Sequence, residues 1–251
     1  MRKNKIIITV FAILISLALS ACGTPGERYE SAAEKYEDAD AVISHFSSTL
    51  QAVDGEFTIK TEFSGELRIN RSESVEMALS GQLKTESGET VPVNAYYTGG
   101  VFYSDMAGGK YRMEMTAEEA LAQIGLCGFA SGLSAGDFQA VSIGENEEGD
   151  TKIEYVISPE KAVKIYGAAE RMQRFALQGS TGGAVSFKET TGSVILDGSR
   201  PVSQSFSLPA SIIFEDRAVA VTDSIYNEFE FFSNKIDMEF PSFSDFVKPA
   251  D

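Results

Sequence analysis

The sequence predicts an α+β fold: a half-barrel made of one long, curved antiparallel β-sheet of about ten strands, with an N-terminal helix and two further helices over its concave face. Two features of the sequence predict this fold class. Apolar and polar residues alternate with a period of two through most of the chain, which is typical of strands with one buried face. Glycine-rich turn signals separate these stretches at short intervals, which indicates consecutive hairpins.

The composition is that of a globular protein, and it excludes several classes of function. Of the 251 residues, 43% are hydrophobic and 23% are charged, which is close to the usual balance of folded domains. This balance excludes a disordered chain and a membrane protein with many spans. The formal net charge is −16. Since phosphate binding needs a basic surface, nucleic acid is not expected as a partner.

The N-terminus has the features of an export signal. Basic residues precede an apolar run over 6–19, which is shorter than the ~20 residues that a bilayer span needs. The run ends in Leu19-Ser-Ala-Cys22, which resembles the lipobox of bacterial lipoproteins. The resemblance implies a signal peptide over 1–21 and diacylglycerol and palmitate-type chains on Cys22. It also implies that the chain is anchored on the extracytoplasmic face of the cell membrane.

The residues after the signal are expected to form a linker and then a helix. Residues 22–40 are interpreted as the lipid-anchored N-terminus with a charged linker or helix start, and 41–251 as a single folded domain. The first helix is predicted over 28–53, because apolar residues recur at helical spacing in its second half. These residues are Val42, Phe46, Leu50 and Val53.

From residue 57 onward the apolar period changes to two. Two long strands are predicted, over 57–70 and 75–84, with Gly65 at a bend or bulge. A meander of hairpins is predicted to follow. Its strands are Val91–Tyr97, Val101–Asp105 and Lys110–Met115.

Two further helices are predicted among the strands. Thr116 and Glu119 form a capping-box pattern, which predicts a short helix that ends at Ile124. Ser158-Pro-Glu160 combines a cap, a first-turn proline and an acid, and predicts a helix that extends to about Leu177. The remaining predicted strands are 138–143, 152–157, 184–189, 192–197, 202–214, 217–223 and 224–233.

The predicted sheet is wider than the predicted helices can cover. Ten strands at ~4.8 Å spacing make a sheet roughly 48 Å wide, whereas three helices cover roughly 30 Å. The apolar face must therefore curl onto itself or leave a hollow. Two alternatives remain open at this point: a core filled by its own side chains, and a concave apolar cavity that accepts an acyl chain.

Several segments resemble a known superfamily. They are Tyr96-Tyr-Thr-Gly-Gly-Val-Phe-Tyr103, Gly109-Lys-Tyr-Arg-Met113, the predicted helix at 117–123, and Phe240-Pro-Ser-Phe243. Together they resemble the LolA/LolB/LppX-like superfamily of bacterial lipoproteins, and in particular its small Gram-positive surface members. The resemblance implies a half-barrel whose hydrophobic cavity holds lipids or acyl chains, and a location on a Gram-positive surface in preference to a periplasm.

The expected function is non-catalytic binding of a lipid or other hydrophobic molecule in the curved-sheet cavity. An envelope structural or protein-interaction lipoprotein with a filled core is the alternative, and its protein partner is not identified by the sequence. The residues expected to line the cavity are Phe57, Ile59, Phe63, Leu67, Ile69, Met77, Leu79, Tyr111 and Met113.

Candidate catalytic and metal-binding residues are few. Ser134 lies in a Gly-x-Ser-x-Gly pattern, but a nucleophile elbow also needs a preceding strand and a histidine later in the chain. The single histidine is His45, which precedes it. The acidic stretch 145–150 is expected to be a solvated hairpin tip, and Cys127 a small buried hydrophobic residue. No enzyme activity, metal or cofactor is therefore predicted.

Overall fold

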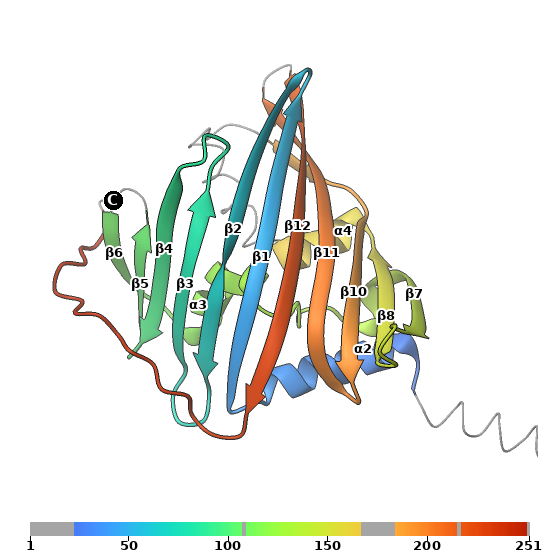
Figure 1. Ribbon diagram of the computed structural model, residues 1–251, viewed down its shortest axis with the longest axis horizontal. Helices are drawn as coiled ribbons and strands as arrows, with labels where there is room; N and C mark the ends of the chain where they lie inside the picture. Colours follow the sequence, from blue (N-terminus) through green and yellow to red (C-terminus); the bar gives the residue numbers. More distant parts are fainter. Residues whose placement is uncertain (1–22, 107–108, 167–183, 215–216, 250–251) are drawn as a thin grey trace, which may run out of the picture.

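A computed structural model describes residues 23–106, 109–166, 184–214 and 217–249 of the chain. In these residues twelve strands form one antiparallel sheet in the order β6-β5-β4-β3-β2-β1-β12-β11-β10-β8-β7, with β9 paired to β11. The sheet stays open, with β6 and β7 at its two edges. The described helices lie on one face, behind the sheet in the view of Figure 1. The predicted fold class is confirmed.

The described residues form three α-helices, two 3-10 turns and twelve strands. The helices are α2 (Pro25–Glu37), α3 (Ala117–Ile124) and α4 (Pro159–Tyr166), with 3-10 turns η1 (Gly125–Cys127) and η2 (Ala135–Asp137). The strands of the first half are β1 (Ala41–Asp54), β2 (Phe57–Asn70), β3 (Glu76–Lys84), β4 (Thr90–Thr98), β5 (Val101–Met106) and β6 (Gly109–Glu114). Those of the second half are β7 (Phe138–Glu145), β8 (Thr151–Ile157), β9 (Ala184–Phe187), β10 (Thr190–Asp197), β11 (Arg200–Phe214) and β12 (Arg217–Phe232).

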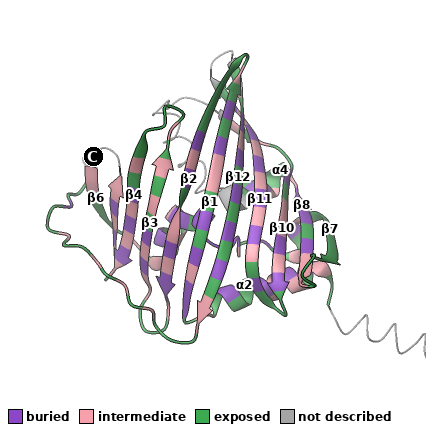
Figure 2. Cartoon of the chain, in the orientation of Figure 1, coloured by how far each residue is buried: buried purple, intermediate pink, exposed green. Residues whose placement is uncertain are grey.

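The first and last strands meet at the centre of the sheet. β1 pairs with β12 in continuous register from Ala41↔Phe232 to Val53↔Ala220, and it pairs with β2 on its other side. The sheet therefore has two halves, a meander from β2 to β6 and the strands β7 to β12. Buried and exposed residues alternate along the central strands (Figure 2), as the period of two predicts.

The predicted helix over 28–53 is wrong in its second half, where the chain forms β1. Val42, Phe46 and Leu50 are buried on one face of this strand. Every fourth residue fits a helix and a strand equally well, so their spacing did not distinguish the two. The positions between them on the same face are Ser44 and Ser48, and these polar residues concealed the alternation.

The first half of the predicted helix is the core helix α2. Its N-terminus has a capping box in which Thr24 accepts a hydrogen bond from the Glu27 N–H, and the Glu27 carboxylate accepts one from the Thr24 N–H. Tyr29, Ala32, Ala33 and Tyr36 are buried against the sheet. The segment expected to be a charged linker or helix start is thus part of the folded core.

Gly65 is a point of close approach between strands and not a bulge. β2 keeps continuous register with β1 and β3 through this residue, which pairs with Phe46 on one side and Gly81 on the other. A Cβ atom on Gly65 would lie 2.3 Å from the Ser80 carbonyl oxygen. The rings of Phe46 and Phe63, with centroids 4.8 Å apart, fill the space above the two glycines.

The remaining differences concern the C-terminal half. The predicted strands 217–223 and 224–233 are one continuous strand, β12. The helix predicted to extend to Leu177 is α4, and its expected continuation lies outside the described residues. After β12 the chain runs past the β4–β6 edge (Figure 1), where the Phe243 ring stacks on Tyr103 with centroids 3.7 Å apart.

Candidate functional site

The segment between α3 and β7 crosses the concave face and is fixed there by polar side chains from the sheet. Asn227 donates to the carbonyl oxygens of Leu126 at 3.2 Å and Gly128 at 2.9 Å. Ser44 donates to the Cys127 carbonyl oxygen. The Gln204 side-chain oxygen accepts from the Ala130 N–H at 2.9 Å. These bonds satisfy backbone groups that would otherwise be buried without partners.

On the α2 side of this segment the concave face is filled. The Tyr29 hydroxyl donates to the Ala130 carbonyl oxygen at 2.8 Å and accepts from Gln204 at 2.9 Å. Gln204 also donates to the Tyr155 hydroxyl at 3.1 Å, and burial raises the pKa of Tyr155. The rings of Tyr29, Tyr155 and Phe129 pack together there. The described residues on this side therefore form a buried aromatic core, the arrangement expected in the first alternative left open by the sequence.

On the other side of the segment lies an apolar cavity of about 190 Å³, between α3 with η1 and the strands β2–β5. It is lined by Phe63, Leu79, Val93, Ala95, Phe102, Ser104, Met106, Gln123, Ile124 and Cys127. The helix α3 is short and packs through Ala120 and Ile124, which leaves this space uncovered by larger side chains. Burial raises the pKa of the Cys127 thiol, so the group is an uncharged part of the wall.

The residues expected to line the cavity have three different surroundings. Phe63 and Leu79 line it, while Leu67, Ile69 and Met77 are buried in the hydrophobic cluster beside it. On the same face of β2, Phe57 and Ile59 are 79% and 51% exposed. Tyr111 and Met113 are exposed on the edge strand β6.

The other lining residues come from strands whose alternation is equally clear in the sequence. Val93 and Ala95 on β4, and Phe102 and Met106 on β5, share the inward phase of their strands. The signal for them was therefore present. The sequence does not show where α3 lies over the sheet. That position determines which strands line the cavity.

A carboxylate is buried on the concave face of the sheet, and the sequence did not identify it as a buried group. Asp223 is 5% exposed and lies between Leu50 on β1 and Leu208 on β11. Its carboxylate accepts a hydrogen bond from Ser48 at 2.7 Å. Burial raises the pKa of Asp223 above the usual aspartate range, and the Ser48 hydrogen bond opposes that shift.

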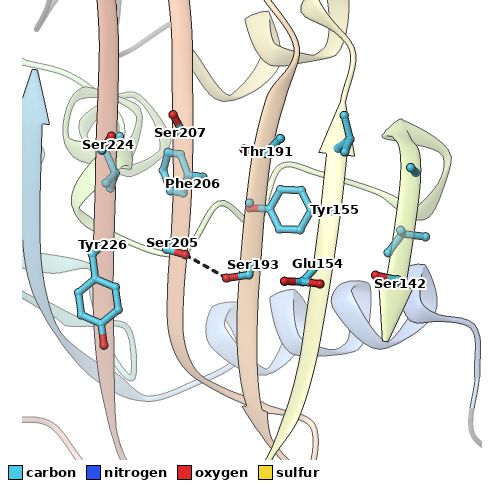
Figure 3. A pocket seen from close by; sticks show the side chains of 15 residues that line it. Ser142, Glu154, Tyr155, Thr191, Ser193, Ser205, Phe206, Ser207, Ser224 and Tyr226 are labelled. Carbon is cyan, nitrogen blue, oxygen red and sulfur yellow. Dashed lines mark hydrogen bonds between the residues drawn. The ribbon is translucent and has the colours of Figure 1, made fainter. Parts of the chain in front are cut away.

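A second hollow, of about 700 Å³, lies on the opposite, convex face over β7, β8, β10, β11 and β12 (Figure 3). Eight of its fifteen lining residues bear a hydroxyl group: Ser142, Tyr155, Thr191, Ser193, Ser205, Ser207, Ser224 and Tyr226. Five others are apolar: Ala140, Val141, Val156, Phe206 and Ile225. Glu154 is the one charged residue in the lining. The two hollows differ in chemistry, since the concave cavity is apolar and the convex one is hydroxyl-rich.

The candidate catalytic residues do not form a hydrolase site. Ser134 caps η2, and its hydroxyl donates to the buried Asp137 carboxylate at 2.8 Å. His45 lies on the convex face, 3.1 Å from Glu230 and 3.6 Å from Glu66. In the part of the chain that the structure describes, no three His, Cys, Asp or Glu side chains are arranged to hold a metal ion. Each helix described is too short or too polar to cross a bilayer.

No known family pattern matches the chain, and no curated protein matches it. Solved structures do resemble it. LprF from Mycobacterium bovis is 11% identical, with a TM-score of 0.44 over 87% of this chain and 97% of that one. The LolA superfamily protein NE2245 from Nitrosomonas europaea is 10% identical, with a TM-score of 0.26 over 87% and 96%. A putative outer membrane lipoprotein-sorting protein domain from Vibrio parahaemolyticus is 8% identical, with a TM-score of 0.28 over 85% and 96%. NE2245 is named as a member of the superfamily that the sequence resembles.

Proposed function

We propose that this chain is a non-catalytic lipoprotein, anchored through Cys22 on the extracytoplasmic face of the membrane, that binds an acyl chain or similar apolar ligand. The observation that carries the proposal is the apolar cavity between α3 and β2–β5. Eight of its ten lining residues are hydrophobic, and Ser104 and Gln123 are the two polar ones. An apolar cavity with few polar groups favours a hydrocarbon over a polar metabolite.

The size of the cavity limits what part of a ligand it takes. An engineered cavity of about 150 Å³ holds benzene, so 190 Å³ accepts the end of one acyl chain and not a whole lipid. Beyond the cavity the same face of β2 exposes Ile59 and Phe57. These two side chains supply an apolar surface on which the rest of the chain would lie.

The anchor would keep the domain close to the membrane. Gly23 and Thr24 separate Cys22 from the first residue of α2, a span of at most about 11 Å. Because α2 is part of the core, no helical stalk lies between the bilayer and the sheet. A ligand with an acyl chain would then have a short path between the membrane and the protein.

An envelope structural or protein-interaction role is the alternative. It is supported by the buried core beside α2, where the rings of Tyr29, Phe129 and Tyr155 pack together. This alternative requires that the cavity beside α3 remain unoccupied in cells and that no fatty acid enter it.

Binding of the fluorescent fatty acid cis-parinaric acid distinguishes the two roles. Ala95→Phe places a ring in the cavity, because the Ala95 side chain is part of its wall, and we expect the affinity to fall at least tenfold, or about 1.4 kcal/mol. Ala220→Phe is the matched control, since Ala220 is exposed on β12 away from the cavity. Equal binding by both variants, or no binding by the unaltered chain, contradicts the proposal.

A further inference from the structure

The convex hollow is built from side chains in register across five strands. Ser142, Glu154, Ser193, Ser205 and Tyr226 form one row, because each residue pairs with the next across neighbouring strands. The row crosses β7, β8, β10, β11 and β12 from edge to centre (Figure 3). A second row next to it carries Thr191, Ser207 and Ser224.

The small hydroxyl side chains make this part of the sheet both hollow and polar. Exposed strand positions usually carry larger residues, which stabilise the sheet by packing across strands. Here serines replace them. Each hydroxyl has one donor hydrogen and two acceptor lone pairs, and the Ser193 and Ser205 oxygens, 3.0 Å apart, use only part of that capacity on each other. The serine rows therefore supply a dense set of donors and acceptors among the apolar lining residues.

Tyr226 supplies an aromatic surface at one end of the hollow. Its side chain is 42% exposed, and its hydroxyl donates to Glu228 at 2.6 Å, two residues further along the same strand. Figure 3 shows the ring lying along β12, and the hydrogen bond to Glu228 holds it in that position. The face of an aromatic ring is electronegative, so it attracts the C–H groups on one side of a sugar ring.

The charges around the hollow exclude anionic ligands. None of the fifteen lining residues is Lys or Arg, and the one acid among them, Glu154, is paired with Lys152 at 2.6 Å. A neighbouring hollow of about 600 Å³ shares Tyr226. It is lined by Glu147, Glu148, Asp150, Glu228 and Glu230 among others. Phosphate-bearing ligands are repelled here. Val141, Val156, Phe206 and Ile225 make part of the lining apolar, which suits the C–H groups of sugar rings, while the serine rows suit their hydroxyl groups.

We propose that this hydroxyl-rich hollow binds a carbohydrate chain without negative charge, with one sugar ring on Tyr226 and its neighbours on the serine rows. The volume of about 700 Å³ is in the range of small-ligand sites. The site is on the opposite face from the apolar cavity, so it does not depend on the function proposed above.

Co-sedimentation of the detergent-solubilised full chain with insoluble chitin, cellulose or mannan tests this proposal. We expect binding to at least one polysaccharide, and Tyr226→Ala to weaken it about tenfold. Tyr226→Phe keeps the ring and should retain most of the binding. Ser205→Leu fills the hollow and should abolish binding, whereas Ser64→Leu, on the same convex face outside the hollow, should not.

Three results would overturn the carbohydrate site. One is the absence of sedimentation with all three polysaccharides. Another is binding that is unchanged both in the Tyr226→Ala variant and in the Ser205→Leu variant. The third is a preference for vesicles of anionic phosphatidylglycerol that depends on Tyr226, because that would assign the surface to a membrane and not to a glycan. The melting temperature of each variant separates loss of the site from loss of the fold.

Discussion

Several polar residues are buried on the inner face of the sheet, and three of them hold the segment that crosses it. Ser44, Gln204 and Asn227 each bond its backbone. Asp223 is different, because its hydrogen-bond partner is a side chain of the sheet itself, Ser48. A carboxyl group placed among apolar neighbours favours its neutral form, so this residue opposes folding whenever it must be charged.

Asp223→Asn tests that cost. A folded pKa above the unfolded value means that stability is fully present at low pH. It is lost as the pH rises from about 3.9, the usual value of an unfolded aspartate, through the raised folded pKa. Relative to the asparagine variant, the unaltered chain should therefore become less stable as the pH rises from 4 to 7. Urea midpoints at several pH values measure this difference, and a difference that is constant with pH contradicts the account.

Gly65 is the residue where a single methyl group should have the largest effect. The added carbon of Gly65→Ala would lie 2.3 Å from a backbone oxygen and 2.5 Å from the Gly81 Cα atom, so the strands must separate. We expect a loss of about 1–3 kcal/mol in the free energy of unfolding. Gly132→Ala, where nothing lies within 4 Å, is the control and should change little. Equal denaturation midpoints for both variants would show that β2 and β3 are not this close.

At the scale of elements, the sequence predicts strands well where one face alternates cleanly. The strands β2, β3, β4 and β5 lie where the period of two places them. The prediction for β1 was wrong because the polar residues Ser44 and Ser48 interrupt its apolar face. The tertiary structure gives the reason: Ser44 donates a hydrogen bond to the crossing segment, and Ser48 donates one to Asp223. The helix α2 lies in a strongly charged segment of the sequence. Its buried face consists of two tyrosines and two alanines, which give only a weak hydrophobic pattern, so the sequence did not show that this helix belongs to the core.

The C-terminal segment protects an edge of the sheet. The Arg112 N–H of β6 donates to the Val247 carbonyl oxygen at 2.9 Å, and the Val247 N–H donates to the Lys110 carbonyl oxygen at 3.1 Å. An unpaired edge strand is a template for association with other chains, and this segment covers part of it. Its position depends on the aromatic contacts of Phe243 with Tyr96 and Tyr103.

Phe243→Ala should release that edge. Loss of the stacked ring is expected to cost about 1 kcal/mol and to raise the hydrogen-exchange rate of the Arg112 amide roughly fivefold. Phe57→Ala removes an aromatic ring that is 79% exposed and should leave that rate unchanged. Exchange measured by NMR compares the two. Full protection of Arg112 in Phe243→Ala would show that the segment is held by other contacts.

At the scale of the whole molecule, the sheet is wider than the described helices, and the described residues pack differently on the two sides of its concave face. The comparison of widths predicted a shortage of cover but not its place. The aromatic cluster of Tyr29, Phe129 and Tyr155 fills the half beside α2, and the short α3 leaves the other half hollow. In the described residues, an aromatic cluster thus lies beside α2 and an apolar cavity beside α3.

The proposed membrane attachment is a property of the whole chain and would depend on one residue, Cys22. Cys22→Ser removes the thiol that the lipobox pattern predicts to be acylated, so the protein should leave the membrane fraction for the soluble one. Cys127→Ser is the control, because that thiol is buried in the cavity wall and should have no role in anchoring. Fractionation and immunoblotting of cells give the answer. Retention of Cys22→Ser in the membrane would contradict the predicted anchor.

Contacts between a bound fatty acid and the cavity wall test the central claim most directly. With palmitate labelled with ¹³C at its terminal methyl group, nuclear Overhauser effects to the methyl groups of Ile124 and Met106 are expected, because both residues line the cavity beside α3. Ile143 is exposed on β7, far along the sheet, and should show none. Effects to Ile143 in place of Ile124 and Met106, or no effects at saturating palmitate, would contradict an acyl-chain site between α3 and the sheet.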